Sequence, residues 1–130
     1  MAQIEVLLVT RLKADGAVAA LVGGRVHPDR LPQGTTYPAL RYVMVDRVEV
    51  LAKPGSLALR IVRASVQLDC YAATYGQAKA LAAAVKGSMY GWQDGANGVI
   101  QARVTDERDG DDAEETMQRV IVDASITYNE

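Results

Sequence analysis

The sequence has no phenylalanine and only one cysteine, Cys70, and one histidine, His27. A single cysteine excludes a disulfide within the chain, so we expect a buried free thiol in a reducing compartment. A zinc site within one chain needs more histidine or cysteine ligands than this sequence offers. His27 also lacks an adjacent carboxylate or hydroxyl motif that would place a base beside a nucleophile. We therefore predict no catalytic residue, no metal ligand and no cofactor.

The chain also lacks an excess of positive charge and any long apolar run. Its 14 Lys and Arg residues stand against 16 Asp and Glu residues, a net charge of −2. General attraction to nucleic acid or to an anionic membrane is not expected, and any contact with DNA should be loose or repulsive. No stretch approaches about 18 uninterrupted apolar residues, and the N-terminus lacks a signal-peptide pattern. We expect neither secretion nor membrane insertion.

What the sequence does contain is aliphatic residues. Apolar residues make up 49% of the 130 positions, but aromatic residues only 5%. This length suits one domain with one core. A core of Val, Leu, Ile and Ala is typical of a β-rich layer covered by helices with small side chains.

The clearest pattern runs from Ile61 to Lys86. Even positions from Val62 are apolar and odd positions are polar, which predicts a strand with one buried face. Thr74 and Gln77 have the spacing of a capping box, so a helix should begin there. Its apolar stripe, which can fold back onto the strand, consists of Ala78, Leu81, Ala82, Val85 and Met89.

The preceding residues predict a broken helical layer. The spacing of leucines predicts a helix over Ile4 to Lys13. Asp15 can cap a second short helix, Ala17 to Val22, which Gly23 and Gly24 would end. Arg25 to Pro38 is rich in proline and predicts a rigid irregular connection, in which Val26 pairs briefly at a sheet edge.

Three further strands are predicted over Ala39 to Val50, Val99 to Thr105 and Met117 to Tyr128. The first should turn into the Ile61 strand through Lys53 to Ser56. The side chains that we expect to point inward from that first strand are Leu40, Tyr42, Met44, Val48 and Val50. The fold class is therefore α+β: a single domain of residues 1–130, with helices packed on one face of an antiparallel sheet of about four main strands, in the order α-β-β-α-β-β.

The other face of this sheet should carry charges of both signs. Its predicted side chains are Arg63, Gln67, Asp69, Gln101, Arg103, Arg119 and Asp123. This surface is either solvated or covered by a neighbouring subunit, because paired charges of both signs set the register of interfaces. The interface candidates are Arg63, Asp69, Arg119 and Asp123.

An acidic segment, Asp106 to Glu115, separates the last two strands. Calcium binds clusters of hard oxygen atoms. The spacing does not fit an EF-hand loop, because Arg108 and Gly110 stand at ligand positions when the loop begins at Asp106. A solvated hairpin tip is the simpler interpretation.

Several short motifs resemble a known family. They are Leu31-Pro32-Gln33-Gly34, Tyr37-Pro38-Ala39-Leu40 and Val66 to Tyr75, followed by Ala78 and Leu81. In this order the chain resembles the small tail-completion, or tail-terminator, proteins of long-tailed bacteriophages and prophage-derived elements. The likeness extends over nearly the whole chain, including the turn from Val22 to Val26.

The resemblance implies a structural virion protein without enzymatic activity. Proteins of that family form a ring, usually a hexamer, on the head-proximal end of the tail tube. The ring stops tube polymerisation and joins the head connector, so the implied partners are other copies of the chain, the tail-tube protein and the connector. Assembly would take place in the bacterial host cytoplasm. DNA would pass without specific binding, and we expect Asp109, Asp111 and Asp112 to face its channel, where they repel phosphate.

Two alternatives remain open from the sequence. Head-tail connector, or neck, proteins have a similar size and occupy neighbouring positions in the same particles. A different class is a small oligomeric ligand-binding or enzymatic α+β domain, in which His27 or the acidic segment completes a site across a subunit interface.

Overall fold

The computed structural model describes residues 3–52, 60–110 and 117–130. Its elements, in chain order, are α1 (Ile4–Ala14), α2 (Gly16–Val22), β1 (Val26–Pro28), β2 (Ala39–Ala52), β3 (Arg60–Ala72), α3 (Tyr75–Met89), the 3-10 helix η1 (Gly95–Asn97), β4 (Val99–Gly110) and β5 (Gln118–Asn129). The turn predicted at Lys53 to Ser56 lies outside the described residues, as do Asp111 and Asp112.

The strands form one sheet in the order β1-β2-β3-β5-β4. β2, β3, β5 and β4 pair antiparallel, and β1 joins β2 in parallel at Val26–Pro28. The predicted α+β class with four main strands is confirmed. β1 is the brief edge pairing expected around Val26.

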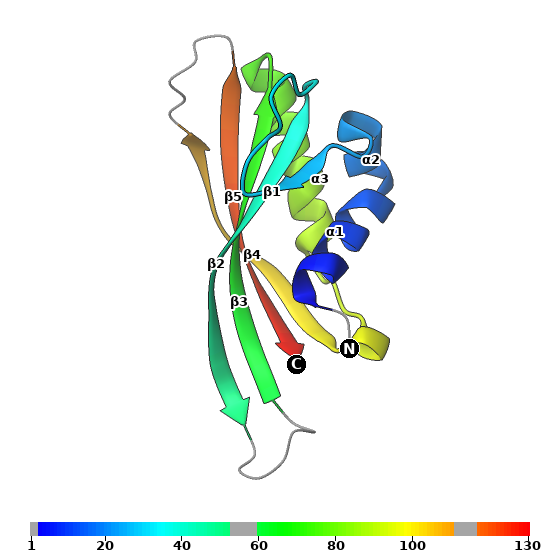
Figure 1. The fold of residues 1–130 in the computed structure, drawn as a ribbon, viewed down its shortest axis with the longest axis vertical. Helices are drawn as coiled ribbons and strands as arrows, with labels where there is room; N and C mark the ends of the chain where they lie inside the picture. Colours follow the sequence, from blue (N-terminus) through cyan, green and yellow to red (C-terminus); the bar gives the residue numbers. More distant parts are fainter. Residues whose placement is uncertain (1–2, 53–59, 111–116) are drawn as a thin grey trace.

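The three helices cover one face of the sheet (Figure 1). The side chains between the two layers form one mainly aliphatic core, whose aromatic members are Tyr42, Trp92 and Tyr128. Among the fully buried residues are Leu8, Leu12, Leu40, Leu68, Leu81, Val85, Met89 and Ile126. Cys70 is a free, buried thiol in this core, as predicted.

Local capping positions the helices where the sequence predicts them. The Asp15 carboxylate accepts hydrogen bonds from the amides of Ala17 and Val18 at 3.0 and 3.1 Å. The Thr74 hydroxyl accepts one from the amide of Gln77 at 3.2 Å. Each cap satisfies amide groups that have no partner within the helix, so α2 and α3 begin at defined residues.

The predicted orientation of β2 is wrong in its second half. The register against β3 shifts between Met44 and Asp46, so Val45 is an extra residue without a partner. Such a bulge exchanges the two faces of the strand beyond it. Val48 is consequently 46% exposed rather than buried, and Val50, which stands at a second register shift between Glu49 and Leu51, is 51% exposed.

The predicted limits of the acidic segment are also wrong at its first end. Asp106 to Gly110 continue β4, and Asp106 pairs with Asp123 of β5 after a second register shift at Thr105. The backbone of these residues is held by the neighbouring strand. The first five residues of the predicted acidic tip therefore belong to a strand.

Candidate functional site

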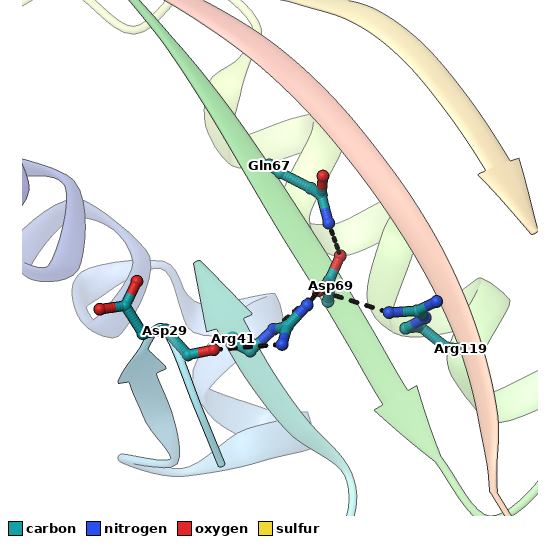
Figure 2. Close-up of polar contacts among 5 residues, drawn as sticks. All are labelled: Asp29, Arg41, Gln67, Asp69 and Arg119. Carbon is teal, nitrogen blue, oxygen red and sulfur yellow. Dashed lines mark hydrogen bonds and ion pairs between the residues drawn. The ribbon is translucent and has the colours of Figure 1, made fainter. Parts of the chain in front are cut away.

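Asp69 of β3 is the centre of a charge cluster on the sheet face opposite the helices (Figure 2). Its side chain is completely buried. Arg41 Nε of β2 donates to Asp69 Oδ2 at 2.8 Å, and Arg41 Nη2 pairs with the same oxygen. Gln67 Nε2 donates to Asp69 Oδ1 at 2.9 Å, and Arg119 Nη1 of β5 lies 3.9 Å from Oδ2. The carboxylate thus holds groups from three adjacent strands.

The aromatic ring of Tyr71 packs against both arginines of this cluster. The guanidinium carbons of Arg41 and Arg119 lie 6.0 and 5.9 Å from the centre of the Tyr71 ring. Both arginine side chains remain about one-fifth exposed, at 22% and 20%. A planar guanidinium that stacks on an aromatic ring keeps outward N–H groups available for a carboxylate or a phosphate. The part of the cluster that can meet a partner is therefore its two arginines.

The backbone positions these arginines further. Arg41 Nη1 donates to the carbonyl oxygen of Asp29 at 3.1 Å, which ties the segment after β1 to the cluster. Gly110 pairs with Arg119 across β4 and β5. A Cβ atom at Gly110 would lie 2.3 Å from Arg119 Nε, so this glycine leaves room for the arginine side chain.

Asp123 and Arg63, the other two interface candidates, lie on the same face but outside the Asp69 cluster. Asp123 pairs with Arg108 of β4, which also bonds Asp106 Oδ2 at 3.0 Å. These carboxylates raise the pKa of Arg108, Asp123 most of all. Arg63 is exposed and lines a shallow hollow of about 220 Å³ with Arg103, Gln101, Ser125 and Thr127.

Asp109, a predicted channel residue, lies on the helix side of the sheet. Its carboxylate accepts a hydrogen bond from Tyr75 Oη, with distances of 3.1 and 3.2 Å to the two oxygens. This bond is the main reason that the pKa of Tyr75 is raised. The end of β4 is thereby fastened to the first turn of α3.

Glu107 makes a second link between β4 and α3. Lys79 Nζ and Lys86 Nζ lie 2.6 and 2.7 Å from its two carboxylate oxygens. The hydrogen bond from Lys79, followed by that from Lys86, lowers the pKa of Glu107. The same bond raises the pKa of Lys79. These ion pairs hold the end of β4 against α3.

The structure brings only two of the four interface candidates, Asp69 and Arg119, into direct contact. Arg41 and Tyr71 complete their cluster, and neither is a candidate from the sequence alone. One signal does exist for Arg41: it occupies a polar position in the predicted strand that pairs with β3. The register that places it opposite Asp69 depends on the fold of the hairpin.

The other features considered from the sequence are His27, metal-binding groups and membrane-spanning helices. His27 lies in β1, opposite Arg41 in the parallel pair. Within residues 3–52, 60–110 and 117–130, no group of three or more His, Cys, Asp or Glu side chains is arranged to hold a metal ion. In the same ranges, none of the helices combines the length and the apolar character that crossing a membrane requires.

The family described as Tail completion protein gp17 matches residues 6–129 of the chain. The protein belongs to this family and is a structural, phage-type tail protein. The predicted resemblance to tail-completion proteins is thereby confirmed.

A solved structure has the same fold. It is a chain of the "Virion of native gene transfer agent (GTA) particle", with a TM-score of 0.68 and 20% sequence identity. The match covers 95% of this chain and 92% of that chain. At this identity the similarity shows the fold. A comparison with curated proteins finds no match.

Proposed function

We propose that the protein forms a ring, a hexamer, on the head-proximal end of a phage-type tail tube. The ring ends polymerisation of the tube and provides the joint to the head connector. The observation that carries this proposal is the tail-completion family match over residues 6–129. The role is mechanical, so it needs no catalytic residue and no cofactor. Assembly takes place in the bacterial host cytoplasm, before the protein becomes part of the virion tail.

The sheet face opposite the helices is the proposed subunit surface. The helices of the same chain cover one face, whereas the opposite face exposes Arg63 and the outward edges of Arg41 and Arg119. Asp69 is buried, so its part is to hold the two arginines in place. Asp123 holds Arg108 in the same way. A ring needs two different surfaces on each subunit, and this face supplies one of them.

The acidic segment around Asp111 and Asp112 is the proposed channel element. Asp111 and Asp112 carry the charge that repels DNA phosphate, so that DNA passes without specific binding. Asp109 belongs to the same element, but its bond to Tyr75 gives it a second role, because it anchors β4 to α3. Glu107 and its two lysines support that anchor.

Electron microscopy of particles made without this gene tests the proposal. We expect overlong tails, together with DNA-filled heads that carry no tail. A plasmid copy of the gene should restore normal particles. Normal tails joined to heads would contradict the proposal. Tails of normal length beside tailless heads would instead indicate a connector.

The channel element is tested separately with the double substitution D111N/D112N. We expect normal rings and normal tail length, but fewer infectious or DNA-transferring particles. The control is Lys13→Gln, which changes an exposed charge on α1. Unchanged DNA delivery in the double variant would contradict the channel role of these carboxylates.

A further inference from the structure

Both margins of the sheet have open strand edges at the same end. β1 covers β2 only at Leu40–Tyr42, and no other described strand pairs with that edge of β2. β4 is the last strand at the opposite margin (Figure 1), where Asp94 pairs with Val99 alone. Open edges expose backbone N–H and C=O groups that can pair with a strand of another molecule.

Each open edge has one regular stretch between two bulges. In β2 the register shifts on either side of Asp46–Glu49. In β4 it shifts on either side of 101–104. Residues that pair with one another across β2, β3, β5 and β4 form a row of the sheet. Asp46 shares a row with Arg103, Arg47 with Ala102, and Val48 with Gln101. The two margins therefore match in level over these three rows.

The side chains of the matched rows are complementary. Asp46 and Arg103 project from the same face and are both exposed. Among the described residues, neither has an ion-pair partner. Opposite charges directly across two strands stabilise pairing, and like charges destabilise it. One row further, the exposed Val48 lies level with the exposed Gln101.

The directions of β2 and β4 also allow antiparallel pairing between two copies. β2 runs antiparallel to β3, β3 to β5, and β5 to β4, so β2 and β4 run in opposite directions. A second copy beside the first, in the same orientation, would bring its β4 antiparallel to the free β2 edge. Such a contact joins two different surfaces, and it closes into a ring when the rotation between copies allows.

We propose that Asp46–Val48 of one copy pairs with residues 101–103 of the next, with Asp46 facing Arg103 across the boundary. The inference rests on the proposed ring and adds a strand pairing at the sheet margins to the proposed contacts of the sheet face. Where these strands pair, the sheet continues from one subunit to the next. The bulges that flank each stretch confine the pairing to these rows.

Cysteine crosslinking tests directly whether Val48 of one copy lies opposite Gln101 of the next. Val48→Cys and Gln101→Cys are combined in the full-length protein, and purified tails that carry this variant are mildly oxidised. Residues opposite each other on antiparallel strands have Cα atoms about 4.5 to 5.5 Å apart, within the range that a disulfide bridges. Cys70 is buried and does not compete. We expect a ladder of covalent multimers on a non-reducing gel.

The single cysteine variants are the matched controls, and each should remain monomeric. A dimer from Val48→Cys alone would show that two β2 edges meet, which contradicts the proposal. Absence of the ladder, in tails whose terminal ring is visible by electron microscopy, would also contradict it while leaving the proposed function intact. If deletion of the gene leaves tails normal, the proposed function itself fails.

Charge reversal gives an independent test. Asp46→Arg and Arg103→Asp should each abolish ring formation, because each places like charges in one row. The double variant should restore rings, since it exchanges the two charges. Lys13→Glu, on the exposed surface of α1, is the control for charge alone. Failure of the double variant to rescue, with all variants folded by circular dichroism, would overturn the pairing.

Discussion

Replacement of Asp69 by asparagine should destabilise the protein strongly, although the two side chains have nearly the same shape. The substitution removes a completely buried negative charge that Arg41 contacts with two nitrogens and that Arg119 approaches at 3.9 Å. Loss of one partner from a buried ion pair leaves the other charge uncompensated, at a cost of about 3 kcal/mol. The arginines are about one-fifth exposed, so water compensates part of their loss, and we take the lower end of the usual range.

Thermal unfolding of the purified variant measures this effect. For a chain of 130 residues, a loss of about 3 kcal/mol lowers the melting temperature by roughly 10 °C. Asp123→Asn is the matched control on the same face, because Asp123 pairs with the exposed Arg108. Such a pair contributes at most about 1 kcal/mol. If Asp69→Asn changes stability no more than the control does, the cluster does not hold the strands together.

Three further predictions concern other parts of the chain. Burial raises the pKa of the Cys70 thiol, so a thiol reagent should modify it only after unfolding; rapid labelling of the native protein would contradict this. The lowered pKa of Glu107 means that its ion pairs stabilise the fold above the ordinary carboxyl pKa, and that this stabilisation is lost as pH falls through the lowered pKa. The stability difference between the wild type and Glu107→Gln should therefore shrink on acidification, as urea unfolding at several pH values would show; a constant difference would refute it. Val48→Thr should change the free energy of unfolding by less than about 0.5 kcal/mol, whereas Val66→Ala should lower it by about 2 kcal/mol, because only Val66 is buried. Denaturant unfolding measures both, and equal losses would place Val48 in the core.

Local patterns in the sequence predict the elements of this fold well. The alternation from Val62 to Ala72 matches the buried and exposed faces of β3 as far as Leu68. The Asp15 and Thr74 caps lie where the sequence places them. These features depend on residues within a few positions of one another, because helix caps and strand alternation are set by the backbone of a single segment.

The candidate site was less predictable. Asp69 occupies a polar position in the alternation, yet it is buried, because Arg41 and Arg119 converge on it from the neighbouring strands. Asp109 reads as part of an acidic tip, yet its partner is Tyr75 of α3. Whether a charge is solvated or paired depends on side chains that are far away in the sequence.

The sequence by itself determined the order of helices and strands, the aliphatic core, the buried thiol and the resemblance to tail-completion proteins. Only the tertiary structure decided which face each charge occupies. The bulge at Val45 turns Val48 outward, and the shift at Thr105 turns Glu107 and Asp109 toward α3. A bulge exists only relative to a partner strand, so one added residue in a ladder reverses every side chain beyond it without leaving a local signature.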